Sequence, residues 1–189
     1  MPKYLYLARI EWAETWIGGG PIPISLASTY RSIERGGTQT PDENLIHNSP
    51  VDIASLRHSG FRFENVRGLT FVGNISNGRM LPSFYNADYY MDDGLILSFS
   101  NVCNAEVCKR LGKVICVELL DVERLKAHLD NELGVVGTAK DCRYTADHQR
   151  NHFLKSIEDE WQQEFRLFWP IKESRTVVLP HGFARHASL

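Results

Sequence analysis

The segment that most constrains the fold is residues 159–169, where large apolar residues alternate with polar ones. If the segment is a strand, its side chains point alternately to the two faces of a sheet. One face then carries Trp161, Gln163, Phe165, Leu167 and Trp169, and the other carries Gln162, Glu164, Arg166 and Phe168. The first face is suited to the core. A carboxylate beside the interior is costly unless it is paired, neutralised or used, so Glu164 is the first candidate functional residue.

Length and composition indicate one folded domain spanning residues 1–189. Of the 189 residues, 43% are hydrophobic and 23% are charged, which suits a protein with a substantial core. The formal net charge of -2 argues against general nucleic-acid binding, which needs many Lys and Arg contacts to phosphate. The apolar runs are too short for a signal peptide or a membrane span, so we expect a cytoplasmic protein with no membrane partner. The four cysteines lack a CxxC pair and are expected to be buried thiols.

The order of strand and helix signals favours an α+β fold. Besides residues 159–169, strands are predicted at residues 3–11, 61–74, 94–100, 113–120, within 135–144, and at 176–179. Helices are predicted at residues 25–35 and 49–60, from Asn101 or Asn104 to Gly112, and from Asp121 to Gly134. We therefore expect a mixed, mostly antiparallel sheet of six or seven strands with about four flanking helices. Glu164 would lie on a central strand and face a cleft.

Residues 77–93 are predicted to form a long irregular segment with several aromatic residues, Tyr89 among them. Long loops in compact domains are often functional, and aromatic loops often line ligand sites. Tyr89 is therefore a candidate ligand-binding residue, and a loop packed only by its own tyrosines is the competing interpretation. The glycines at 18–20 lack the spacing of a nucleotide-binding loop.

Three polar features follow one another along the chain. Arg9 stands at the end of the first predicted strand. Ser98 and Ser100 share a face at the end of another strand, and Gln162 lies two residues before Glu164. In this order they resemble the signature of ADP-ribosyltransferases, which is an Arg, a Ser-x-Ser on a strand followed by a helix, and a Gln/Glu-x-Glu near the end. Arginine is suited to phosphate, and a fixed carboxylate is suited to a developing positive charge.

The resemblance implies an ADP-ribosyltransferase-like fold that uses NAD, either for transfer to a protein or nucleic-acid acceptor or as an NAD glycohydrolase. It implies that Arg9 meets the NAD phosphates and that Ser98, with Ser100 on the same strand, shapes the nicotinamide site. It further implies that Glu164 stabilises the oxocarbenium-like transition state and that Gln162 contacts the acceptor. Such an activity would suit conflict between phages and bacteria.

The chain also resembles a widespread family of bacterial and phage proteins of unassigned function. The similarity lies in a strand ending near Phe-Ser, a Gly-Lys strand and a late segment with a recurrent set of residues. The late residues are Lys155, Trp161, Gln162, Glu164, Arg166 and Leu167. This resemblance implies no activity.

A non-catalytic protein that inhibits a host or phage complex is the main alternative. It predicts that Arg9, Glu164 and Arg166 form a buried structural network of ion pairs that no cleft reaches. The acceptor, the partner and the oligomeric state are left open by the sequence.

A metal-dependent hydrolase is the third candidate. His148 and His152 are four residues apart, as in the helical zinc motif HExxH, and Cys142 could be a third ligand. The residue after the first histidine is Gln149, which lacks the carboxylate that serves as general base in that motif.

Overall fold

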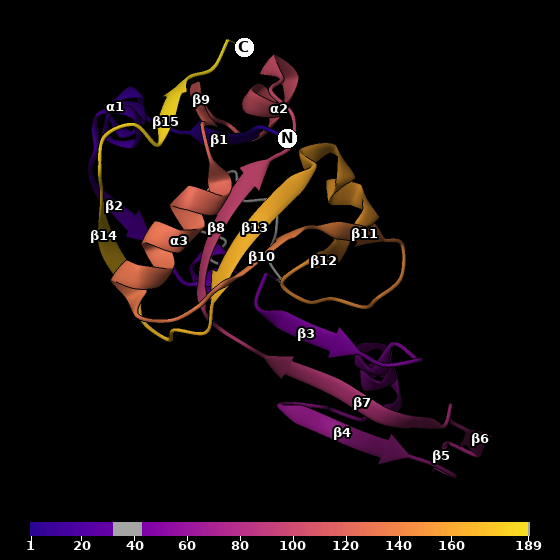
Figure 1. Cartoon of the computed structure of the whole chain (residues 1–189). Coiled ribbons are helices and arrows are strands. Elements are labelled where there is room, and N and C mark those ends of the chain that lie inside the picture. The colour runs from indigo at the N-terminus through magenta and orange to yellow at the C-terminus, as the bar shows by residue number, and fades with distance from the viewer. Residues whose placement is uncertain (32–42, 189) are drawn as a thin grey trace.

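A six-stranded antiparallel sheet forms the centre of the computed structural model, which describes residues 1–31 and 43–188 (Figure 1). Its strand order is β10-β13-β8-β1-β9-β15. These strands are β1 (Lys3–Leu7), β8 (Leu95–Ser100), β9 (Ile115–Leu119), β10 (Thr138–Asp141), β13 (Glu164–Trp169) and β15 (Ala184–His186). The predicted α+β class with a mostly antiparallel sheet is confirmed, and β13 lies inside the sheet between β10 and β8.

One face of this sheet holds the main hydrophobic core. Phe165, Leu167 and Trp169 of β13 point into it, as the alternation of the sequence predicts. The elements that cover this face are α1 (Ile10–Gly18), β2 (Gly20–Ile24), α3 (Val122–Leu133) and β14 (Arg175–Leu179). Helix α3 begins after its Asp121 cap and ends at Gly134 in a left-handed conformation, as predicted.

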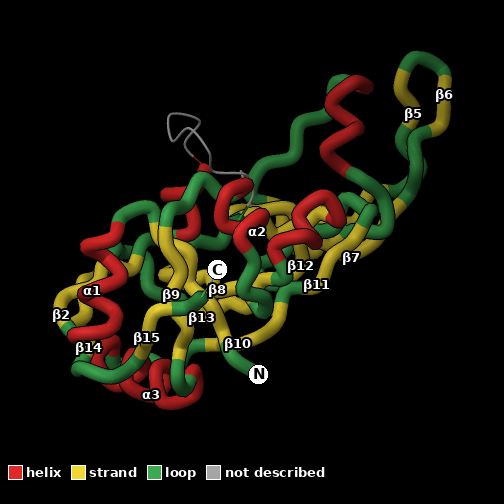
Figure 2. Tube along the Cα trace, turned by 90° about the horizontal axis from the view of Figure 1, so that it is seen from above, coloured by secondary structure: helices red, strands yellow, loops and turns green. Residues whose placement is uncertain are grey.

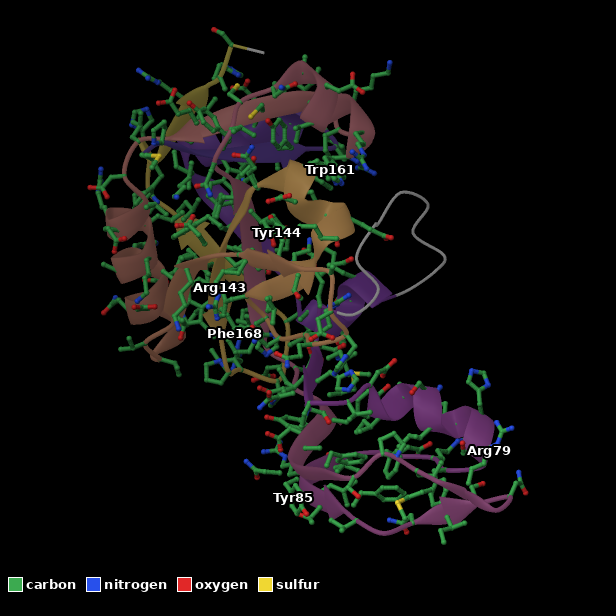
Figure 3. All side chains as sticks on the ribbon, turned by 90° about the vertical axis from the view of Figure 1, so that its right-hand side faces the viewer. Arg79, Tyr85, Arg143, Tyr144, Trp161 and Phe168 are labelled. Carbon is green, nitrogen blue, oxygen red and sulfur yellow. The ribbon has the colours of Figure 1, made fainter. Side chains whose placement is uncertain are left out.

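The opposite face of the sheet carries polar side chains and is also covered. Its covering elements are α2 (Ala105–Arg110), β11 (Arg143–Thr145), β12 (Leu154–Ser156) and the 3₁₀ helix η3 (Ile157–Gln162). Tyr144 of β11 accepts a 2.8 Å hydrogen bond from the Glu164 backbone N–H, which ties this cover to β13. Tyr144 and Trp161 lie in this part of the molecule (Figure 3).

A second, smaller sheet extends away from the first (Figures 1 and 2). It has the order β3-β7-β4. Its strands are β3 (Leu45–Asn48), β4 (Val66–Phe71) and β7 (Phe84–Met91). The same extension contains the short hairpin of β5 (Ile75–Ser76) and β6 (Arg79–Met80) and the 3₁₀ helix η2 (Ile53–Ser59). Ile53, Leu56 and Phe84 belong to a separate hydrophobic cluster inside this extension. Among the described residues, no helix is long and apolar enough to cross a membrane.

Several predicted elements are wrong in extent or type. The first strand ends at Leu7 rather than at residue 11, because a helix begins at Ile10. The predicted irregular segment 77–93 contains β6 and the eight-residue strand β7. The first part of 159–169 is the end of η3, so the strand begins only at Glu164.

The two predicted helices between the first strands also differ. The helix at 49–60 is the 3₁₀ helix η2, capped by Asp52 and ended by Gly60. Of the helix at 25–35, the described part is the 3₁₀ helix η1 (Ala27–Arg31), and the remainder lies outside the described residues. All four cysteines are free thiols; Cys108, Cys116 and Cys142 are buried, and Cys103 is partly exposed.

Candidate functional site

The central sheet has an opening between β1 and β8. The two strands pair only at Tyr4 and Ser100. At the other end of β8, the Ile96 N–H donates to the Ser25 carbonyl at 3.1 Å, so β8 has a different partner there. Antiparallel strands direct the N–H and C=O of alternate residues to the same neighbour, so those of Ser98 and Tyr6 face the opening. In these two fully described strands, Ser98 and Tyr6 do not pair across it.

A pocket of about 550 Å³ lies at this opening. Residues 4–8 and 97–100 line it from the two strands, with further walls from α1 and β2. Trp12, Trp16 and Phe99 give it aromatic surface. Its polar lining includes Ser98, Ser100, Gln162, Glu164, Glu43 and Lys113. The pocket therefore combines flat apolar walls, open backbone groups and charged side chains, which are the usual components of a small-molecule site.

Glu164 is an almost buried carboxylate at this pocket, and two cations contact it. The Lys155 ammonium lies 2.7 Å and the Arg166 guanidinium 3.0 Å from its Oε2 atom. Burial would raise the pKa of the carboxyl, but the charges of Arg166 and Lys155, with hydrogen bonds from Lys155 and Ser98, outweigh burial and hold the pKa below its usual value. Glu164 is therefore ionised at neutral pH.

The surrounding network fixes the position of this carboxylate. Arg166 is completely buried, and it also donates to Glu43 at 2.7 Å and to the His152 carbonyl at 2.8 Å. Lys155 donates to the side-chain oxygen of Gln162 at 2.7 Å, so the amide and the carboxylate share one ammonium. Lys155 also lies 3.8 Å from Asp159, so two cations and three carboxylates meet here, and each buried charge has an opposite charge as partner.

Four of the predicted site residues come together. Ser98, Ser100, Gln162 and Glu164 all line the pocket. The Ser100 hydroxyl is committed to the fold, because it donates to the Gln162 carbonyl at 2.8 Å and accepts from the Val102 N–H at 3.2 Å. It joins the end of β8 to the end of η3.

Arg9 and Tyr89 do not join this group. Arg9 lies after the end of β1, at the N-cap of α1, where it is exposed with its guanidinium 5.5 Å from the Trp12 ring centre. The early end of the strand moves Arg9 off the sheet and out of the pocket lining. Tyr89 is on β7 in the extension, where its ring meets His47 edge-on at 4.9 Å.

Two charged residues of the site were not predicted. Glu43 is 123 positions from its partner Arg166, and no local pattern links them. Lys113 was included only in a predicted strand, although it reaches the pocket from the turn before β9. The one local indication in the sequence was a lysine directly after Gly112, in a turn that leads into a strand.

The predicted metal site is not formed. Residues 148–152 are not helical, and His148 contacts the Ser49 carbonyl at 2.8 Å. His152 stacks on Phe168 with 3.8 Å between ring centres and contacts the Glu43 carbonyl at 3.1 Å. Within residues 1–31 and 43–188, no group of three or more His, Cys, Asp or Glu side chains is placed to hold a metal ion.

No protein-family model, curated protein or solved structure matches the chain. A function for the protein is therefore inferred from the geometry of the pocket alone.

Proposed function

We propose that the pocket binds NAD and that the protein is an NAD-using ADP-ribosyltransferase or NAD glycohydrolase. The observation that carries the proposal is the convergence of Ser98, Gln162 and Glu164 on one pocket at an opening in the sheet. These residues come from two neighbouring strands and the 3₁₀ helix before one of them. Their order along the chain was the first indication of this chemistry.

The open backbone of β8 suits the nicotinamide group. A carboxamide has an N–H donor group and a C=O acceptor. A paired strand would offer the same two groups to the backbone of Ser98. Its ring is a flat cation in NAD, and the exposed aromatic side chain of Trp12 at the pocket provides a surface for it. The nicotinamide would thus take the place that the backbone of Tyr6 leaves open.

The Glu164 carboxylate is suited to stabilise the positive charge that develops when NAD loses nicotinamide. When the bond between ribose C1′ and the ring nitrogen breaks, its electron pair leaves with neutral nicotinamide and positive charge develops on the ribose. A carboxylate fixed by Lys155 and Arg166 needs little reorganisation to stabilise that charge. Both cations contact Oε2, and the Ser98 hydroxyl also hydrogen-bonds to the carboxylate. Water or an acceptor nucleophile then forms the new bond to C1′.

A non-catalytic binding protein is the second candidate, and the pairing of Glu164 favours it. A carboxylate with two cationic partners also serves as a structural group, and Arg166 links it to Glu43 on a distant segment. The two functions differ in the expected effect of neutralising Glu164. A structural role predicts lower stability without any NAD chemistry to lose.

Nicotinamide release from NAD, measured by chromatography with and without candidate acceptors, tests the proposal. The Glu164→Gln variant keeps the size of the side chain, and we expect it to lose about 10²- to 10³-fold in rate. Glu158→Gln changes the same charge at an exposed position on η3 and should keep the wild-type rate. Melting curves of both variants show whether they are folded. A folded wild type that neither binds NAD in calorimetry nor releases nicotinamide contradicts the proposal.

A further inference from the structure

Lys113 brings a cation to the pocket without an acidic partner. It lies in the turn between α2 and β9, where its N–H donates to the Cys108 carbonyl at 2.9 Å. Gly112 makes this turn with a φ of 66°. The side chain is partly buried, and within residues 1–31 and 43–188 no carboxylate pairs with it in a salt bridge or hydrogen bond. This distinguishes it from Lys155, which contacts Glu164.

The position of Lys113 is the second part of the argument. The N–H of Val114 donates to the Leu7 carbonyl at 3.0 Å, so Lys113 adjoins the last residue of β1. Glu164 lies level with the other end of β1 but two strands away, because Tyr4 pairs with Ser100 of β8 and Ser100 pairs with Glu164 of β13. Three residues of a strand span about 10 Å. The two residues therefore line the pocket at levels that correspond to opposite ends of β1.

A pocket with these charges suits a ligand whose own charges are separated. Burial lowers the pKa of the Lys113 amine, which means that its charge loses water without gaining a carboxylate. An anionic ligand group would supply the missing partner. NAD has this character, because its ribose next to nicotinamide and its diphosphate are separate groups, and Glu164 and Lys113 both line the pocket.

We infer that Lys113 is the diphosphate-binding residue of this pocket. The inference rests on the proposed function and assigns to Lys113 the contact with NAD phosphates that the resemblance to ADP-ribosyltransferases implied for Arg9. Arg9 is exposed beside Trp12 and does not line the pocket. An ammonium on a flexible stem binds phosphate as a point charge, so no fixed fork geometry is needed.

A structural role for Lys113 makes a different prediction. A cation after the last turn of α2 also interacts favourably with the carbonyl end of the helix. In that case Lys113→Met would lower the melting temperature and leave ligand affinity unchanged. Ligand binding and stability therefore have to be measured on the same variants.

Calorimetry with three ligands separates the interpretations. NAD and ADP-ribose carry the diphosphate, and nicotinamide riboside has the same ring and ribose without phosphate. We expect Lys113→Met to weaken the two diphosphate ligands by about tenfold or more and to leave the riboside unchanged. Lys109→Met, at an exposed position on α2, and Arg9→Met should bind all three ligands as the wild type does.

The outcomes distinguish this inference from the proposed function. A wild type that binds none of the ligands overturns both. If the wild type binds NAD and Lys113→Met binds it equally well, the role of Lys113 is wrong and the proposed function stands. An equal loss for the riboside also overturns the role of Lys113.

If Lys113→Met does not fold, a measurement on the wild-type protein still tests the inference. ADP-ribose should protect Lys113, but not Lys109, from acetylation detected by mass spectrometry. Unchanged acetylation of Lys113 at saturating ADP-ribose overturns the inference.

Discussion

The Arg166 guanidinium lies 3.0 Å from the carboxylate of Glu164, two residues earlier on the same strand. Residues two apart on a strand share a face, so the pair is formed by β13 itself. Arg166 also forms an ion pair with Glu43. Lys155 of β12 forms a second ion pair with Glu164. The pair thus joins three segments of the chain beneath the pocket.

Replacing Arg166 should be strongly destabilising. Arg166→Met would leave Glu43 without the cation at 2.7 Å and Glu164 with Lys155 alone. Removing one partner of a buried ion pair typically costs about 3–5 kcal/mol, which urea unfolding can measure. Arg175→Met, in an exposed pair with Glu173, should cost at most about 1 kcal/mol. Equal losses for the two variants would show that the buried network contributes no more than a surface pair.

Stability should depend on pH through His152. Burial lowers the pKa of this imidazole from 6.5, against the opposing effects of the Glu43 carbonyl and Asp92. The unfolded chain therefore takes up a proton at higher pH than the folded chain does. The resulting stabilisation is fully present above pH 6.5 and is lost as the pH falls towards the folded pKa.

Urea unfolding at pH 7.5 and pH 5.5 measures this effect. One proton changes the free energy of unfolding by up to about 1.4 kcal/mol per pH unit. His152→Gln should lose less stability than the wild type over this interval, while His47, whose pKa burial also lowers, acts in both proteins. Identical pH dependence in the two proteins would exclude a contribution from His152.

Gly94 should not tolerate a side chain. A Cβ at this position would lie 2.5 Å from the Phe168 ring and from the Trp169 carbonyl oxygen. Overpacking of this kind costs about 1–3 kcal/mol, and a backbone oxygen cannot move aside easily. Gly18→Ala is the matched control, because a Cβ there has no heavy atom within 4 Å. Thermal unfolding should therefore show a clear loss for Gly94→Ala alone.

Local patterns in the sequence predicted the elements whose ends carry capping residues and whose faces alternate cleanly. Helix α3 between Asp121 and Gly134 and the core face of β13 are examples. The resemblance to ADP-ribosyltransferases, rather than these local patterns, implied that Ser98, Gln162 and Glu164 share a site, and all three line the pocket. The predictions for α3 and β13 depend on contacts within one segment or between adjacent strands.

Long-range contacts explain what the sequence did not predict. Tyr89 lies in a strand because β7 pairs with both β3 and β4, although the segment is rich in turn-forming residues. Glu43 became part of the site through a contact with Arg166 that spans 123 positions. Arg9 was assigned to a strand because it is not a typical helix-capping residue, although α1 begins one residue later.

The opening between β1 and β8 has a bounded length. It is closed at one end by the pairing of Tyr4 with Ser100 and at the other by the contact of Ser25 with Ile96. The four residue-to-residue steps from Ile96 to Ser100 span only about 13 Å of strand. An extended polypeptide needs free passage at both ends to add as a strand, whereas a compact metabolite with one amide group does not. We therefore expect the gap in the ladder to admit a small molecule and not the extended chains that bind at open sheet edges.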